Sequence, residues 1–211
     1  MSSYLDMSTR NPSTGCSDNR RAVYNLEIYI TSNESRLGAD GLQTDESIGQ
    51  MYRDAWSRFA TGVTVITTVE SDGSVHGMTA SSVTSVSLDP PLVLVVIGES
   101  RQTHGLIELT GRFGMSILHA GQTKIAKYFA TPPESRGEID SSNVTRLSRT
   151  PVIANAIAAM NCKVSAAYKA GDHTVFIGEV EEIEVGEGDP LVWFQRQFGG
   201  FADQNTDSDS E

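Results

Sequence analysis

Hydroxyl side chains crowd one segment of the chain, from Thr79 to Ser87, which reads TASSVTSVS. In a strand, alternate residues share a face, so Thr79 and Ser81 would point one way and Ser82 the other. A strand that continues into a loop therefore offers hydroxyls and backbone N–H donors to one polar ligand. The alternative is a Ser- and Thr-rich edge strand that faces water, and the composition of the segment does not decide between the two.

Motifs of several other enzyme classes do not occur in the sequence. No GxGxxG follows an expected strand, and GxxxxGK[ST], HExxH and GxSxG do not occur, which excludes dinucleotide-binding Rossmann, P-loop, zincin and α/β-hydrolase interpretations. The histidines have no metal-ligand spacing, and no cysteine or paired carboxylate completes a ligand set, so we expect no metal. Cys16 and Cys162 predict neither a disulfide framework nor a redox pair. The histidines are His76, His104, His119 and His173.

Charge and hydropathy narrow the expected partners and location. The formal net charge of −11 argues against nucleic-acid binding, because phosphate affinity there comes from clustered Lys and Arg. No stretch of about 18 apolar residues occurs, and the N-terminal sequence lacks the basic start and apolar run of a signal peptide. We therefore expect a cytoplasmic protein that binds neither membrane nor nucleic acid. Any phosphate must be held mainly by hydroxyls and backbone N–H groups.

Hairpins are expected to dominate the fold that positions these side chains. A turn signal joins a β-branched run, residues 63–69, to the hydroxyl-rich segment, which we expect to run as one strand from residue 78 towards residue 88. A second hairpin joins residues 160–168 to residues 173–185. Further strands are expected at residues 92–97, a buried central strand, and at residues 113–118 and 190–194.

Three helices and one long loop complete the expected elements. The first helix has Thr44 or Asp45 as its cap and stops at Gly62, and Gly111 closes the second. Residues 131–150 have no period and are expected to form a long connecting loop. The helices are expected at residues 44–62, 103–110 and 122–130.

The short strands and few helices predict a mainly β fold, a closed or nearly closed barrel with helical decoration rather than a doubly wound parallel sheet. A chain of 211 residues with 38% apolar content suits one domain, which we place at residues 44–201. Residues 1–43 are rich in Ser, Asn, Gly and Asp and are expected to form a mostly mobile N-terminal extension. Residues 202–211 are expected to be an acidic, disordered tail.

Five blocks of the sequence carry a family resemblance. They are RDAWSRFATGVTVITT (53–68), GMTASS (77–82), SVSLDPP (85–91), GRFGMSIL (111–118) and GDHTVFIGEV (171–180). In this order, over about residues 47–200, they resemble the flavin-reductase-like family with the FMN-binding split-barrel fold. Each block alone is a weak motif, but five in register make chance agreement improbable.

The resemblance implies a homodimer built on a split β-barrel, which binds FMN or FAD near the subunit boundary and takes hydride from NADH or NADPH. Most members are reductase components of two-component monooxygenases and release reduced flavin to a partner oxygenase. An NAD(P)H-dependent flavin reductase is therefore implied. Two alternatives stay open: an enzyme of this fold that keeps its flavin and reduces a small acceptor such as ferric ion or a quinone, and a non-catalytic flavin-binding subunit or carrier.

The resemblance also assigns flavin-binding candidates by position. The TASS segment would line the ribityl chain and the isoalloxazine edge, with Ser87 at the turn beside it. Thr103 would help to bind phosphate at a helix N-terminus. Ser100 is a weaker candidate, because Arg101 and Gln102 stand where the family usually has Ser. The candidates are Thr79, Ala80, Ser81, Ser82, Ser87, Ser100, Thr103 and Phe129.

His173 is the catalytic candidate that the resemblance implies, on the nicotinamide side of the flavin, while Phe129 would flank the flavin. A hydrogen bond from His173 to flavin or to the carboxamide is one interpretation, and a solvated turn residue is the other. Hydride transfer needs the two rings within about 3–3.5 Å, so the role of the protein is mainly positional. Trp193 and Phe198 stand where the family frequently has tyrosines, and Arg196 replaces a usual Gly.

Overall fold

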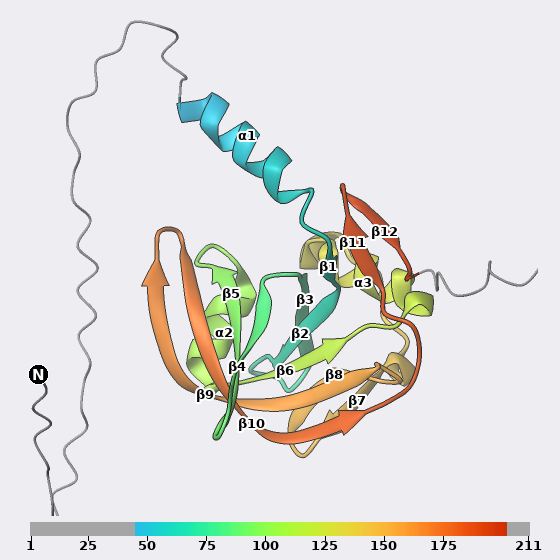
Figure 1. Cartoon of the computed structure of the whole chain (residues 1–211). Coiled ribbons are helices and arrows are strands. Elements are labelled where there is room, and N and C mark those ends of the chain that lie inside the picture. The colour runs from blue at the N-terminus through green and yellow to red at the C-terminus, as the bar shows by residue number, and fades with distance from the viewer. Residues whose placement is uncertain (1–44, 202–211) are drawn as a thin grey trace, which may run out of the picture. The chain divides into compact units, whose positions relative to one another are not determined.

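The computed structural model describes residues 45–201 (Figure 1). These residues belong to one unit of the chain, which spans residues 43–211. The expected N-terminal extension, residues 1–43, and the expected acidic tail, residues 202–211, lie outside the described residues. The described part is rich in strands and has few helices, so the expected mainly β fold is confirmed.

A seven-stranded antiparallel sheet forms the barrel, in the order β3-β2-β6-β9-β10-β5-β4. Both expected hairpins are confirmed: Val69 pairs with Val75 across the first turn, and Ala170 pairs with His173 across the second. Gly171 supplies the positive φ, 65°, that the second turn requires. The strands are β2 (Thr64–Val69), β3 (Val75–Ala80), β4 (Val83–Leu88), β5 (Pro91–Gly98), β6 (Arg112–Ile117), β9 (Ala158–Ala170) and β10 (His173–Val185).

The hydroxyl-rich segment is two strands rather than the one that was expected. β3 and β4 are the opposite edges of the sheet, yet only Ser81 and Ser82 separate them. Since extended residues span about 3.3–3.6 Å each, the two edges lie within about 11 Å of each other, and the sheet must curl into a barrel (Figure 1). Ser82 leaves the β3 ladder because it bonds Val96 twice: its carbonyl accepts from Val96 N at 3.0 Å, and its hydroxyl donates to Val96 O at 2.8 Å.

Three apolar clusters stabilise the described part of the fold, and the two larger ones lie in the barrel and under a helix. The first fills the barrel and includes Phe113 and Phe176, each almost fully buried. The second lies under helix α3 (Thr123–Ala130), which buries Ala126 and Phe129 three residues apart on one face. Helix α2 (Gln102–Thr110) ends at Gly111 with φ of 66°, as expected. α3 follows a short 3₁₀ turn, η1 (Ala120–Gln122), and therefore confirms the third expected helix.

Helix α1 (Asp45–Trp56) is shorter than expected. It ends at Trp56 rather than at Gly62, because the Ser57 hydroxyl bonds the Asp54 carbonyl at 2.8 Å and closes the last turn. Gly62 belongs instead to β1 (Thr61–Gly62), where it pairs with Val192 of β11 (Val192–Phe194). β11 confirms the last expected strand, and it continues into β12 (Gln197–Gly199), which was not expected.

Residues 131–150 are more regular than the loop that was expected. They contain two 3₁₀ turns, η2 (Pro133–Ser135) and η3 (Ser141–Asn143), and the strand β7 (Val144–Leu147), which pairs with β8 (Thr150–Ile153). The Asp140 carboxylate accepts from Ser142 N at 2.9 Å and so fixes the start of η3. Local capping thus orders a segment that lacks hydrophobic periodicity.

Candidate functional site

Three adjoining cavities, of about 160, 200 and 520 Å³, follow the end of β3 to the Ser81–Ser82 link. The first two share Thr79, and the last two share Ser81 and Trp193. We call them together the split groove. Its polar end is lined by Thr103, Arg101 and other residues of β3 and α2, and its open end by Ser82, Val96 and α1. Arginines line both ends of the groove, but those at the open end donate to side chains of α1, Arg53 to Gln50 and Arg196 to Asp54.

The TASS segment lines the wall of the split groove. The Thr79 hydroxyl donates to the Ala126 carbonyl at 2.7 Å, and the Ser82 hydroxyl donates to Val96 O. Both oxygens therefore remain free to accept from ligand N–H groups. Ser81 is exposed, and its hydroxyl has no hydrogen-bond partner among the described residues. Ala80 belongs to the apolar cluster of the barrel and also lines the groove.

Thr103 is buried at the polar end, where α2 begins. Its hydroxyl lies 2.9 Å from His76 Nε2, and His76 Nδ1 lies 3.1 Å from the Glu70 carboxylate. Burial has the largest effect on the pKa of His76 and lowers it, whereas the hydrogen bond to the Glu70 carboxylate acts to raise it. The sequence analysis weighed His76 only as a possible metal ligand and rejected that role. Its contact with Thr103 joins β3 to α2 and can be seen only in the folded structure.

Two guanidinium groups line the polar end, from Arg101 and Arg136. Arg136 donates from Nε to Thr131 O at 2.6 Å and from Nη2 to Phe129 O at 3.0 Å. Its guanidinium lies 5.5 and 5.4 Å from the centroids of Tyr128 and Phe129. Burial lowers the pKa of Arg136 from its usual high value, and the group stays charged at neutral pH. Sequence reasoning missed Arg136, because it lies in the segment that was interpreted as an unpatterned loop.

Phe129 forms part of the floor of the polar end. It is 2% exposed, and its ring packs directly on Gly77 of β3. A Cβ built on Gly77 would lie 2.9 Å from Phe129 Cε1. The glycine therefore lets the ring approach the sheet. The GMTASS block thus supplies a close-packing glycine as well as hydroxyls.

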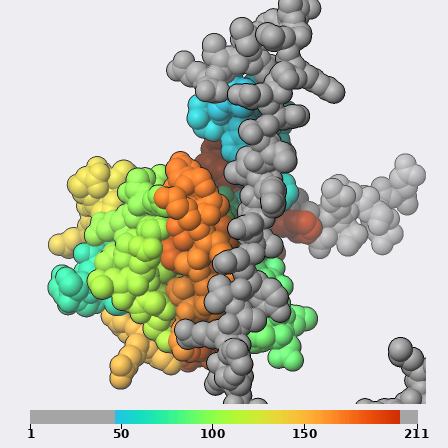
Figure 2. All heavy atoms as spheres, turned by 90° about the vertical axis from the view of Figure 1, so that its left-hand side faces the viewer, coloured from blue at the N-terminus to red at the C-terminus, as the bar shows by residue number. Residues whose placement is uncertain are grey.

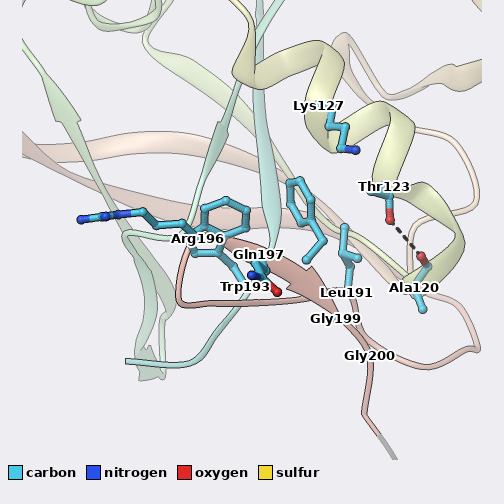
Figure 3. Close-up of a pocket in the computed structure, with 10 residues that line it drawn as sticks. Ala120, Thr123, Lys127, Leu191, Trp193, Arg196, Gln197, Gly199 and Gly200 are labelled. Atoms are coloured by element: carbon cyan, nitrogen blue, oxygen red, sulfur yellow. Dashed lines mark hydrogen bonds between the residues drawn. The ribbon is translucent and has the colours of Figure 1, made fainter. Parts of the chain in front are cut away.

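An aromatic pair closes the other side of the split groove. Trp193 and Phe198 have ring centroids 4.7 Å apart and separate the groove from a neighbouring cavity of about 560 Å³. Figure 3 shows that α3 supplies Lys127 to that cavity, opposite Trp193 on the β11–β12 ribbon. Arg196 turns towards Asp54 and pairs with it at 2.7 Å. The hydrogen bonds from Gln50 and Arg196 lower the pKa of Asp54.

Three of the predicted site residues lie outside the split groove of the same chain. His173 begins β10, is half exposed, and contacts Asp172 Oδ1 through Nδ1 at 2.7 Å. It pairs with Gly98, and its hairpin lies beside α2 in both views (Figures 1 and 2). Ser100 is exposed in the connection that leads to α2. Ser87 lines a separate cavity of about 370 Å³ with Leu88 and residues of β9 and β10.

The titratable side chain buried at the polar end of the groove is His76, in contact with Glu70 and Thr103. Within residues 45–201, no group of His, Cys, Asp and Glu side chains is placed to hold a metal ion. No helix in that same part of the chain is long and apolar enough to cross a membrane. The groove combines hydroxyl acceptors, aromatic walls and guanidinium groups, of which Arg101 and Arg136 lie at the polar end. This donor set fits a flat heteroaromatic ring that carries a phosphate tail.

The chain is similar to known flavin reductases. The model of the flavin reductase like domain matches residues 56–202. An NADH-dependent flavin reductase from Rhodococcus sp is 41% identical over 148 residues, which cover 69% of this chain and 82% of that protein. The reductase component of 4-hydroxyphenylacetate 3-monooxygenase from Thermus thermophilus is 35% identical over 150 residues, 71% of this chain and 94% of that protein.

A solved structure supports the same conclusion. The NADH:FAD oxidoreductase SgcE6 of Streptomyces globisporus, in complex with NAD and FAD fragments, matches with a TM-score of 0.69 at 35% identity, over 79% of this chain and 100% of that one. The split-barrel fold and the NAD(P)H-dependent flavin-reductase activity implied by the five sequence blocks are thereby confirmed at the level of the family. The chain belongs to the flavin reductase-like family.

Proposed function

We propose that this protein binds FMN or FAD in the split groove, reduces it with NADH or NADPH, and releases the reduced flavin to a partner monooxygenase. The main observation behind this proposal is that the groove is continuous from Arg101 and Arg136 to the Ser81–Ser82 link. A flavin would lie along it with its phosphate beside Arg101 and Arg136 and its tricyclic ring near the Ser81–Ser82 link. The relatives named as NADH-dependent flavin reductase and as monooxygenase reductase component support the proposal.

The residues of the chain bind and orient, and the cofactors supply the redox chemistry. Arg101, Arg136 and Thr103 hold the phosphate by charge-assisted hydrogen bonds. The hydroxyls of the TASS segment accept from polar hydrogens of the ribityl chain and ring. The bound flavin and nicotinamide would supply the hydride-transfer chemistry, and the groove residues would hold and orient the flavin for it.

We propose further that the protein acts as a homodimer. Helix α1 leaves a row of large apolar side chains exposed, and the Trp56 ring stacks on Tyr52 and on Phe59, with centroids 6.1 and 5.4 Å away respectively. Such a row favours a protein partner, and a second copy of this chain is the simplest one. Sedimentation equilibrium tests the dimer, and a monomer at micromolar concentration would contradict it.

An anaerobic assay of each nucleotide with each flavin tests the proposed function. We expect oxidation of NADH or NADPH that depends on added FMN or FAD. Purified protein that oxidises neither nucleotide with either flavin would overturn the proposal. Flavin that stays bound through gel filtration, with no stimulation by added flavin, would favour instead an enzyme that keeps its flavin and reduces another small acceptor.

A further inference from the structure

A hydrogen-bonded chain of three side chains ends at the polar end of the split groove. Glu70 Oε1 lies 3.1 Å from His76 Nδ1, and His76 Nε2 lies 2.9 Å from Thr103 Oγ1. His76 and Thr103 are 3% and 2% exposed, and both line the cavity. Glu70 is partly exposed and also accepts from Gln102 Nε2 at 3.4 Å. Of the three, Thr103 is the one with a hydroxyl, and that hydroxyl is held by His76, which is in turn held by Glu70.

The directions of these hydrogen bonds depend on the number of protons on His76. A neutral imidazole beside a carboxylate keeps its hydrogen on Nδ1, so Nε2 accepts and Thr103 must donate its hydroxyl hydrogen to the ring. An imidazolium donates from both nitrogens, to Glu70 and to Thr103. The hydroxyl hydrogen of Thr103 is then free to point into the cavity, where it can meet an anionic oxygen.

Charged groups from three elements surround the imidazole. Glu70, in the β2–β3 connection, favours the imidazolium, whereas Arg136, after α3, disfavours it. Arg101, at the start of α2, lines the same cavity. Burial lowers the pKa of His76, which keeps the ring neutral at neutral pH in the free protein. A phosphate among these groups adds negative charge close to His76 and raises its pKa.

We propose that His76 is a positioning residue that couples the binding of a phosphate-bearing flavin to the uptake of one proton. As the ligand binds, His76 takes a proton from solvent and the Thr103–His76 hydrogen bond reverses direction. The Thr103 hydroxyl then donates to a phosphate oxygen, and no covalent bond other than that to the proton changes. This inference rests on the proposed function, because it requires that the polar end holds the flavin phosphate.

Fluorescence titration of the full chain with FAD, between about pH 5.5 and pH 8.5, tests the coupling. FAD is the suitable probe because its pyrophosphate keeps its charge over this range, whereas a phosphate monoester such as that of FMN titrates near about pH 6. Riboflavin, which has the same ring and ribityl chain but no phosphate, is the control ligand. We expect the Kd of FAD to rise by up to about tenfold for each pH unit above the pKa of free His76, while that of riboflavin stays flat.

Variants separate this role from a purely structural one. In His76→Gln, the amide donates to Thr103 without titrating, so the Kd of FAD should no longer depend on pH. Thr103→Val, which removes the hydroxyl at similar volume, should bind FAD more weakly and also without pH dependence, whereas Thr103→Ser should keep the dependence. Glu70→Gln should move the steep region to lower pH, because the imidazolium loses its carboxylate. Thermal unfolding of each variant checks that it is folded.

The outcomes for the inference and for the proposed function are distinct. A flat Kd of FAD in the wild-type protein, a persistent slope in His76→Gln, or no binding of FAD would overturn the coupling. An active flavin reductase with a flat Kd would retain the proposed function and lose the inference. Proton-linked FAD binding in a protein that oxidises no nicotinamide would retain the inference and lose the reductase.

Discussion

Replacement of Gly77 by Ala tests whether the close approach of Phe129 shapes the split groove. A Cβ at this position would lie 2.9 Å from Phe129 Cε1 and 3.0 Å from the Ile66 carbonyl oxygen, whereas such atoms normally pack at about 3.5–4.0 Å. The Ile66 carbonyl is part of the β2–β3 pairing, so the ring must shift by about 0.5–1 Å. Overpacking of this kind costs about 1–3 kcal/mol, and we expect Gly77→Ala to lower the free energy of unfolding by that amount.

Gly105→Ala is the matched control, because a Cβ on Gly105 in α2 meets nothing within 4 Å. Ala stabilises a helix relative to Gly by about 0.5–1 kcal/mol, so this variant should resist urea better than the wild type and bind FAD equally well. Gly77→Ala should unfold at lower urea concentration and bind FAD more weakly, since Phe129 lines the polar end. Wild-type stability together with wild-type FAD affinity in Gly77→Ala would refute the reasoning.

Three further predictions concern single contacts. Arg136→Leu should weaken FAD binding by about 1.5–3 kcal/mol and leave riboflavin binding nearly unchanged, because FAD carries the phosphate that Arg136 would contact and riboflavin does not; equal losses in fluorescence titrations of both ligands would contradict this. Replacing Ser81 and Ser82 by Ala should weaken flavin binding by about 1–3 kcal/mol in total. An unchanged Kd for the flavin would show that these two hydroxyls do not bind it. Burial raises the pKa of Cys162 to about 12, so in a Cys16→Ser background iodoacetamide at about pH 8 should label the unfolded but not the folded protein; labelling in the folded state, detected by mass spectrometry, would contradict its burial.

The hairpins could be predicted from the sequence because their signals are local. A polar turn between β-branched runs located β2 and β3, and Gly171 marked the turn between β9 and β10. The separation of β3 from β4 could not be predicted in this way, since it depends on the bonds that Ser82 makes to Val96, fourteen residues later. A segment rich in Ser and Thr can be a strand or a link between two strands, so its composition did not reveal the break at Ser81 and Ser82.

The candidate site could be predicted only in part, for a related reason. The family resemblance pointed to the TASS segment, Thr103 and Phe129, which the structure brings into one groove. It gave no indication of His76 or Arg136, whose roles come from packing between β3, α2 and the segment after α3. An isolated histidine and an isolated arginine carry no spacing that a sequence pattern can detect.

The two-residue link between β3 and β4 restricts how this protein can acquire new ligand preferences. An insertion there would separate the sheet edges, and a deletion would leave too little chain to join them. Length variation is therefore available elsewhere on the rim, in the segment that carries Arg136 and in the β11–β12 ribbon. Diversity in ligand choice among related sequences is expected to accumulate in those two segments, while the serine pair keeps its length.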